Sequence, residues 1–517
     1  MRSLIIFLLS TPFVLSILQF RERGYVRLPY NTAGTFGFGR NGATKARYHA
    51  PTRMLYVIGT GTNLMHIIEL TDPDTPAIRY THEFNSAGDG EITDVQVCSD
   101  TIAVSIASNN KVSIGHVELF LPFTKNDNTL TMLGRLAAGS YPKDMAFNND
   151  CSRLVVVNEG KLGLLNGVVN DPQGSMTIIV RNDQGFPPEV NVNFQSFDNR
   201  VLEYVSKGVR YVFRGDSTAS PPIEGSFSKD LEPESVVIDD VGRYAYISLQ
   251  GYLLTANTGA MKQWTLANDG YEFSDGMRAR ALRNSGNIDE ALVGADVLAK
   301  INNDADLAGN IDEALVGADV LAKINNDADL GRLHIGTDDG LNNNQQLIQY
   351  PHSFGGRSVA MWNSVTFQRV YDTGDDLERE AMNKYPITFN GETNNVNLSP
   401  SGEMDLRSDD YGVEPTALDI GSFNGAPVMV TASRSGFIYV YNVVGTALSF
   451  QSVHRRGGTS QTWNNLYNSN QAGDALITDV GYMDETMSPS GQPMAFAVGS
   501  ASSSIGLYDI YDDGNTK

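Results

Sequence analysis

Leu231-Glu-Pro-Glu-Ser-Val-Val-Ile-Asp-Asp-Val-Gly-Arg-Tyr-Ala-Tyr-Ile-Ser-Leu249 is the stretch that decides the fold: an acidic loop, an alternating apolar run, a tight turn and a second apolar strand. The same module returns at 413–431, and looser copies run over 141–160, 91–105 and 478–499. Each strand pair is too small to bury its own face, so the pairs must stack into a larger body, most commonly a radial β-propeller. We therefore predict an all-β fold, a β-propeller of about seven blades with one of them incomplete.

One region breaks this rhythm. Residues 286–307 are repeated without a change at 309–330. Each copy has an asparagine at its start, a glutamate three residues later and a lysine near its end, which is typical of helix termini. We expect a short duplicated helical insertion at 284–330 within a propeller domain that spans 17–517.

The N-terminus has the layout of a secretory signal. One basic residue, Arg2, precedes an apolar run from Leu4 to Leu18, which is short for a membrane span and contains Pro12. We expect 1–16 to be a cleaved signal peptide. The last ten residues are polar and form no hydrophobic anchor signal, so we expect a secreted protein with no membrane span.

The charge balance is strongly acidic. Asp and Glu outnumber Lys and Arg by 60 to 38, which gives a net charge of −22. This sign is opposite to the one that binds phosphate backbones, so we expect no nucleic-acid partner. The same field would gather divalent cations, and carboxylate ligands favour calcium. The alternative is that the charge only keeps the protein soluble.

Two cysteines and one glycosylation sequon fit an extracellular protein. Cys98 and Cys151 lie at strand edges inside two modules. In an oxidising compartment we expect one disulfide between neighbouring blades, with two free buried thiols as the alternative. The sequon Asn397-Leu398-Ser399 lies in a polar loop, so Asn397 is a candidate glycan acceptor.

A set of short stretches, spread over most of the chain, matches the stretches of a known family in the same order. They are Tyr141-Pro-Lys-Asp-Met-Ala-Phe147, 157–160, 171–174, 230–234, 252–257, 330–333, 356–362, 371–376 and Arg407-Ser-Asp-Asp-Tyr-Gly-Val-Glu-Pro415. The set resembles the mesenchyme-specific cell-surface glycoproteins of calcifying animal skeletons. It also resembles bacterial secreted proteins of the same choice-of-anchor class, often labelled alkaline-phosphatase-like. Two departures from the family pattern are Asn257-Thr-Gly259, where the family repeats Asn-Glu-Gly, and an apparent gap beside Gln250.

The resemblance implies an extracellular matrix context, and the phosphatase-like label implies phosphate-ester hydrolysis. That chemistry needs a compact His/Asp constellation. The seven histidines are scattered singly, without metal-ligand spacing: His49, His66, His82, His116, His334, His352 and His454. We therefore keep a metal-dependent phosphoesterase as the alternative hypothesis for the function.

Carboxylates beside prolines and glycines are the candidate metal ligands. In a radial fold, loops at equivalent ends of successive modules converge on one face, which would bring several carboxylates to one calcium ion. The candidates are Glu159, Glu232, Glu234, Asp375, Asp376, Asp409, Asp410 and Glu414. The alternative is that these residues shape turns.

Two arginines in the family's matching stretches, Arg357 and Arg407, are candidate anion ligands for phosphate or carbonate. The alternative is structural pairing with acidic loops. The sequence as a whole indicates a non-catalytic, secreted, acidic matrix protein associated with biomineralisation, with calcium mineral or matrix components as partners. A plain protein-binding scaffold is a further alternative.

Overall fold

The structure is a computed structural model, and it describes residues 17–515 apart from several internal segments. These segments are 182–184, 186–188, 207–208, 210, 220, 239–242, 250–262, 267–270, 275, 279–333, 337–356, 364–365, 367 and 394. The predicted signal peptide at 1–16, the whole of the predicted insertion at 284–330 and the family departure at 257–259 therefore lie outside the described residues.

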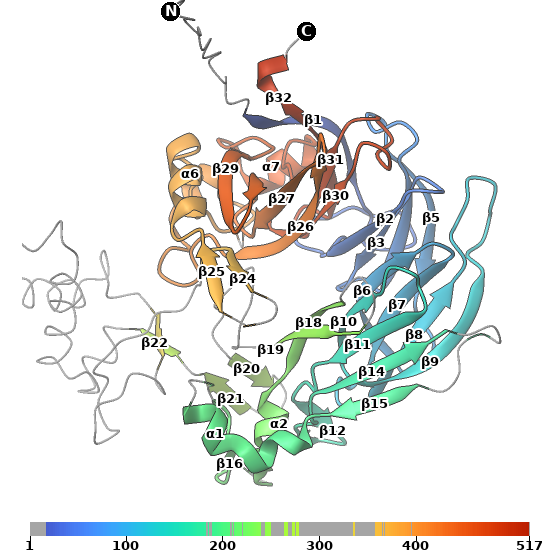
Figure 1. The fold of residues 1–517 in the computed structure, drawn as a ribbon, viewed down its shortest axis with the longest axis vertical. Helices are drawn as coiled ribbons and strands as arrows, with labels where there is room; N and C mark the ends of the chain where they lie inside the picture. The colour runs from blue at the N-terminus through green and yellow to red at the C-terminus, as the bar shows by residue number, and fades with distance from the viewer. Residues whose placement is uncertain are drawn as a thin grey trace, which may run out of the picture.

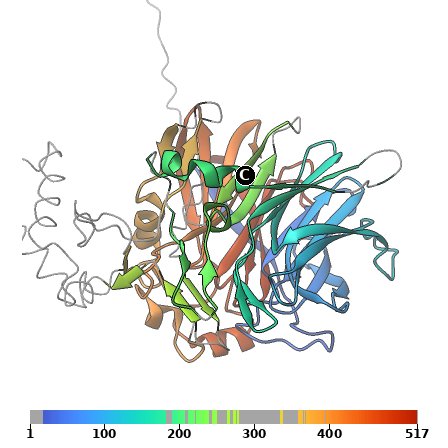
Figure 2. The ribbon, with the colours of Figure 1, turned by 90° about the horizontal axis from the view of Figure 1, so that it is seen from below.

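The described strands form a ring of antiparallel sheets around a central axis (Figure 1). Figure 2, seen from the side of the ring, shows the sheets standing next to one another. Five sheets have four strands. They are β2 (Lys45–His49), β3 (Met54–Gly59), β4 (Leu64–Glu69) and β5 (Ala77–Glu83); β6 (Asp89–Cys98), β7 (Thr101–Ser108), β8 (Ile114–Phe120) and β9 (Met132–Ser140); β10 (Pro142–Phe147), β11 (Arg153–Asn158), β14 (Ser175–Val180) and β15 (Val190–Asn193); β26 (Pro415–Phe423), β27 (Ala426–Ser433), β28 (Phe437–Val444) and β29 (Ala447–His454); and β30 (Ile477–Met483), β31 (Met494–Gly499), β32 (Ser504–Asp512) and β1 (Leu18–Arg27).

Two shorter sheets take places in the same ring. β18 (Pro233–Ile238) pairs with β19 (Ala245–Leu249), and Val236 packs against Val155 and Val157 of the sheet before it. β24 (Ala360–Trp362) pairs with β25 (Arg369–Asp372), and this sheet packs against β27 and β28. The described residues thus contribute seven sheets to the ring, which confirms the predicted β-propeller.

The remaining elements are short and decorate the ring. They are β12 (Gly163–Leu165), β13 (Val168–Asn170), β16 (Gly215–Asp216), β17 (Ile223–Glu224), β20 (Gln263–Leu266), β21 (Tyr271–Ser274), β22 (Gly276–Arg278) and β23 (His334–Gly336), the helices α1 (Val201–Ser206), α2 (Phe227–Asp230), α6 (Asp376–Lys384) and α7 (Trp463–Asn468), and the 3-10 turns η1 (Gln195–Arg200), η2 (Pro400–Glu403) and η3 (Asp513–Asn515). None of the described helices is both long and apolar enough to cross a membrane.

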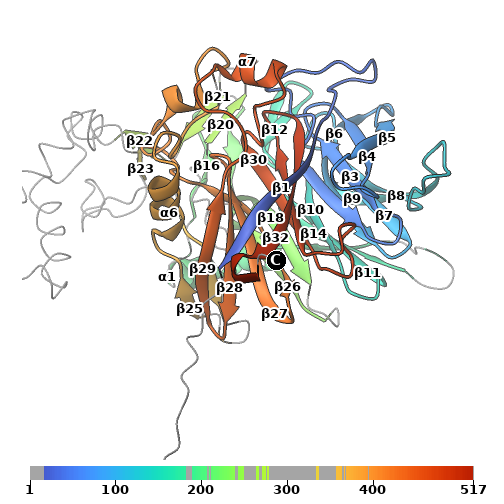
Figure 3. The ribbon, with the colours of Figure 1, turned by 90° about the horizontal axis from the view of Figure 1, so that it is seen from above.

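The two ends of the chain close the ring. β1 lies beside β32 as the outermost strand of the last sheet (Figure 3), with a register that runs from Leu18 opposite Asp512 to Arg27 opposite Ser504. This pairing satisfies a sheet edge that would otherwise be open and joins the first blade to the last.

The core lies between blades, because each sheet is buried on both faces. Along β3, Met54, Tyr56 and Ile58 pack with the following blade, whereas Leu55 and Val57 pack with the last one. This is the period of two that a strand imposes on its side chains. All five sequence modules form the first two strands of a sheet, as the alternating runs predict.

The predicted disulfide is present. Cys98 ends β6, Cys151 lies in the turn between β10 and β11, and their Cα atoms are 5.8 Å apart. The bond therefore joins two neighbouring blades, and the alternative of two free thiols is wrong.

Aspartates on the first strand of a blade bind the next blade through its backbone. Each carboxylate accepts a backbone N–H from the following first strand, at 2.9–3.0 Å. The bonds run from Met145 to Asp94, from Val236 to Asp144 and from Ala46 to Asp479. These bonds hold the first strands around the axis and so fix the positions of the loops that precede them.

Candidate functional site

The loops that lead into the first strands, here called the lead-in loops, repeat the same backbone geometry. The residue before the strand is left-handed in four blades, with φ of 52° at Tyr141, 25° at Glu232, 45° at Glu414 and 58° at Leu476. In each of these blades the strand then skips one residue of register, as in a β-bulge. The lead-in loops of these four blades therefore enter their first strands with the same backbone geometry.

One group of these side chains, the Tyr141 cluster, consists of Glu91, Lys111, Tyr141, Lys143, Glu159, Lys161 and Glu234. Lys143 Nζ lies 3.0 Å from Glu159 Oε2 and 3.2 Å from Glu234 Oε2. Lys161 Nζ lies 3.6 Å from Glu159 Oε1, and 4.6 Å from the centre of the Tyr141 ring. The cluster thus brings together two of the predicted metal ligands, Glu159 and Glu234, and places an ammonium group between them.

The charges within this cluster cancel. Burial would raise the pKa of Glu159, but Lys143 and Lys161 hold that pKa below its usual value. Burial, together with the neighbouring Glu159, raises the pKa of Glu234. Lys143 has a pKa well above its usual value despite burial, because both carboxylates favour its charged form.

A second group, the Arg407 cluster, consists of Arg357, Glu378, Glu392, Arg407, Ser408, Glu414 and Arg434. Arg407 is only 4% exposed; its Nη1 lies 3.1 Å from Glu392 Oε1 and its Nη2 donates to Glu414. Arg357 Nη1 lies 3.2 Å from Glu378 Oε1, and its Nη2 donates to the Ser408 carbonyl oxygen at 2.6 Å. Of the two roles that the sequence allowed for Arg357 and Arg407, the structure shows the structural pairing.

The other predicted ligands lie apart. Asp375 and Asp376 are at the start of α6, where both pair with Arg379 of the same helix. Glu232 is buried at the start of β18, whereas Asp409 and Asp410 are half-buried in the turn before β26. Within the described part of the chain, none of the eight carboxylates belongs to a group of three metal-type ligands whose atoms lie within 4.8 Å of one another. Their geometry does not fit a closed calcium site, and calcium binding stays a prediction.

Asn397 is exposed, in the turn that precedes η2. Its position is compatible with a glycan, which also stays a prediction.

A cluster that the sequence did not indicate lies on the β6–β9 sheet. The ligand atoms of Asp89, His116 and Glu118 are all within 4.8 Å of one another. The expectation that every histidine stands alone is therefore wrong for His116. The available signal was local: His116 and Glu118 are two residues apart on β8, so they share one face of the sheet. Asp89 is 27 residues away in sequence, which spacing alone could not connect.

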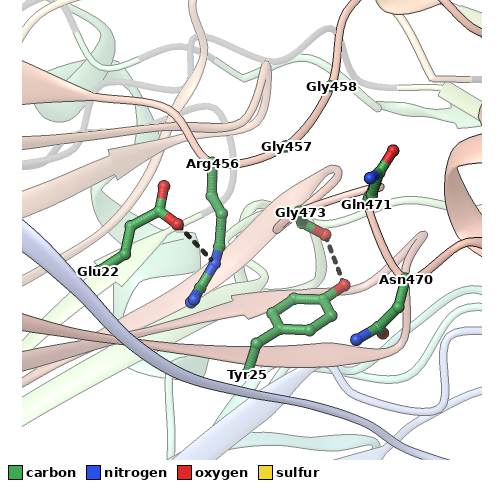
Figure 4. A pocket seen from close by; sticks show the side chains of 8 residues that line it. All are labelled: Glu22, Tyr25, Arg456, Gly457, Gly458, Asn470, Gln471 and Gly473. Carbon is green, nitrogen blue, oxygen red and sulfur yellow. Dashed lines mark hydrogen bonds and ion pairs between the residues drawn. The ribbon is translucent and has the colours of Figure 1, made fainter. Parts of the chain in front are cut away.

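A polar pocket of about 540 Å³ lies between β1 and the loops on both sides of α7 (Figure 4). Its charged groups are satisfied internally: Arg456 Nε lies 3.2 Å from Glu22 Oε2, and the Tyr25 hydroxyl donates to the Gly473 carbonyl oxygen at 2.9 Å. Asn470 and Gln471 supply amide groups to the wall. The lining contains neither a nucleophile with a neighbouring base nor a set of metal ligands, so the pocket suits binding of a small polar group rather than covalent chemistry.

Comparison with known proteins finds a matching family and two related proteins. The family model of the choice-of-anchor I domain matches residues 44–251 and 250–446. Gigasin-3a of Magallana gigas is 30% identical over 186 residues, which is 35% of this chain and 61% of that protein. The mesenchyme-specific cell surface glycoprotein of Strongylocentrotus purpuratus is 22% identical over 151 residues, or 29% of this chain and 19% of that protein. The chain thus spans about three fifths and one fifth of these two relatives.

Among solved structures, the chain is similar to Raptor from Chaetomium thermophilum, with 9% identity and a TM-score of 0.42 over 96% of this chain and 30% of that one. It is also similar to the WD40 repeats of RRP9, with 6% identity and a TM-score of 0.41 over 95% of this chain and the whole of that one.

Proposed function

The chain belongs to the choice-of-anchor I domain family, and from this premise we propose that it is a secreted, non-catalytic protein of a calcified extracellular matrix. It binds calcium mineral through carboxylates spread over its surface. The disulfide and the relative that is a cell surface glycoprotein fit an extracellular protein. The calcified context rests on the resemblance to skeletal proteins.

The observation that carries the proposal is where the negative charge lies. In the Tyr141 cluster, three glutamates are matched by three lysines, so this part of the lead-in loops adds nothing to the net charge of −22. By contrast, each copy of the repeated segment, 286–307 and 309–330, carries five acidic residues and one lysine. The two copies therefore supply eight of the 22 excess negative charges.

Dispersed charge suits a mineral surface better than it suits one bound ion. A closed calcium site needs six to eight oxygen ligands around one centre. Glu159 and Glu234 are instead paired with lysine, and Glu414 with arginine. An extended surface of calcium ions can be bound by many weak contacts at once, because linked contacts add up to a high overall affinity.

Adsorption to calcium carbonate crystals tests the proposal. The wild type is compared with an unrelated protein of equal net charge, and with a variant in which the ten acidic residues of the two repeated copies become Asn or Gln. We expect the wild type to adsorb more strongly than the control, and the variant to lose a large part of its binding. Equal adsorption of the wild type and the control protein would favour the alternative hypothesis that the protein is a plain protein-binding scaffold.

Two further measurements separate the alternatives. Titration calorimetry with calcium should show no single tight site; a one-to-one site with micromolar affinity would restore the closed-site prediction. Sustained turnover of p-nitrophenyl phosphate with calcium, zinc or magnesium would overturn the non-catalytic assignment and favour the phosphoesterase.

A further inference from the structure

One polar cluster lies on a sheet face where the neighbouring residues of β7 are apolar. On β8, His116 and Glu118 are opposite Ile106 and Val104 of β7, and these two apolar side chains pack against the preceding blade. Residues opposite each other on paired strands share a face, so His116 and Glu118 point toward the same interface. Asp89, the first residue of β6, completes the cluster.

The distances within the cluster are unusual for a hydrogen-bonded group. His116 Nε2 lies 3.6 Å from Asp89 Oδ1 and 3.8 Å from Glu118 Oε1, too far for hydrogen bonds. Among the described residues, Nε2 is a buried atom without a hydrogen-bond partner. A buried polar atom left in this state costs free energy, about 1–3 kcal/mol. A zinc ion about 2.0–2.2 Å from each ligand atom would hold tetrahedral ligands roughly 3.3–3.6 Å apart, close to the 3.6 and 3.8 Å that separate His116 Nε2 from the two carboxylates.

The cluster also carries uncompensated negative charge. The side chains of Asp89 and Glu118 are only 4% and 7% exposed. Both face a single guanidinium: Arg135 Nη2 donates to Glu118 Oε1 and lies 3.5 Å from Asp89 Oδ2. Two buried carboxylates thus share one positive charge. The Arg135 side chain is 38% exposed, so it can turn outward into water when another cation arrives.

We propose that Asp89, His116 and Glu118 bind a divalent transition-metal ion, with zinc preferred, and that Arg135 takes the place of the cation when the metal is absent. One imidazole nitrogen and two carboxylates are a ligand set for zinc and its neighbours, whereas calcium prefers oxygen ligands alone. Three protein ligands leave a fourth position for water or for an oxygen atom of an external ligand. This site is independent of mineral binding by the dispersed surface carboxylates.

Calorimetric titration of chelator-treated full-length protein with zinc chloride tests the site, with manganese and calcium chlorides as comparison ions. We expect the wild type to bind one equivalent of zinc. His116→Gln should weaken zinc affinity by about 10- to 100-fold or more, because removing even a hydrogen-bond partner of a metal ligand lowers metal affinity by this factor. Arg135→Gln removes the competing charge and should tighten zinc binding, by about tenfold. The matched control is His454→Gln, because His454 also pairs with a carboxylate, Glu22, at 2.9 Å but has no third metal-type ligand among the residues that the structure describes.

Cobalt substitution gives a second readout. Cobalt bound by the cluster should show visible absorption bands that His116→Gln abolishes and His454→Gln preserves. If His116→Gln fails to fold, the Arg135→Gln titration alone decides. The proposal is overturned by the absence of a zinc site, by equal zinc binding in the wild type and His116→Gln, or by unchanged or weaker binding in Arg135→Gln.

Discussion

Replacing Lys143 by methionine should destabilise the protein in a pH-dependent way. The change keeps the aliphatic stem and removes the ammonium that lies 3.0 Å from Glu159 and 3.2 Å from Glu234. Breaking a buried ion pair from one side costs about 3–5 kcal/mol. The Lys143 side chain is 30% exposed and Lys161 stays 3.6 Å from Glu159, so we expect a smaller loss at pH 7, about 2–3 kcal/mol.

The sign of the pH dependence follows from the two carboxyls. Without Lys143, burial dominates and the pKa values of Glu159 and Glu234 in the folded state rise above those in the unfolded chain. The folded state then binds more protons than the unfolded one, so its stability falls as the pH rises through this range. The deficit of Lys143→Met should be largest at pH 8 and smallest at pH 5.

Urea unfolding at pH 5 and pH 8 measures this effect. Lys143→Met/Glu159→Gln should recover part of the loss, because it removes one unpaired carboxylate. Lys125→Met is the control, since Lys125 is exposed, and it should change stability by less than about 0.5 kcal/mol. Equal deficits at both pH values, or no recovery in the double variant, would show that Lys143 does not neutralise these carboxylates.

Three further predictions concern other parts of the ring. Cys98→Ala/Cys151→Ala should lower the free energy of unfolding by about 4 kcal/mol in urea titrations, because the disulfide closes a loop of 53 residues. Burial lowers the pKa of His66 to about 4, so its neutral form should contribute about 3 kcal/mol above pH 6.5 that is lost as the pH falls toward 4; His66→Gln should flatten that part of the stability profile. Arg407→Met should cost about 3–5 kcal/mol at pH 7 in thermal or urea unfolding, whereas the exposed Arg379→Met should cost less than about 1 kcal/mol.

The blades could be predicted because their signal is local. In residues 231–249 the alternating run, the turn and the second run lie next to one another in sequence, and they form β18 and β19. The closure of the ring has no such signal. β1 is an outer strand whose charged residues interrupt the alternation, and its partner β32 is at the other end of the chain. Only the fold brings them together.

The chemistry of the lead-in loops was harder to predict than their position. The sequence showed Glu159 and Glu234 beside turns, which suggested metal ligands. Lys143, which neutralises both, is 16 residues before one and 91 before the other. It is placed between them because the β10 and β18 strands are neighbours around the axis. The Asp89, His116 and Glu118 cluster escaped prediction for the same reason, since it joins strands β6 and β8 across the intervening β7.

The residue that the register skips in each bulge shows what these loops do. Lys143 and Glu234 occupy this position in successive blades and form an ion pair with each other. At the same position Thr416 donates to the Ile477 carbonyl oxygen at 3.1 Å, and Thr478 donates to that of Thr44 at 2.8 Å. If every blade carried the same charged residue at this position, like charges would lie close together at one end of the ring. Burying like charges near one another disfavours their ionised forms. In these four blades the residue at this position instead binds a neighbouring blade. The side chains of the lead-in loops thus bind one blade to another. We therefore expect ligand binding at features that the blades do not share, such as the His116 cluster and the repeated acidic segment.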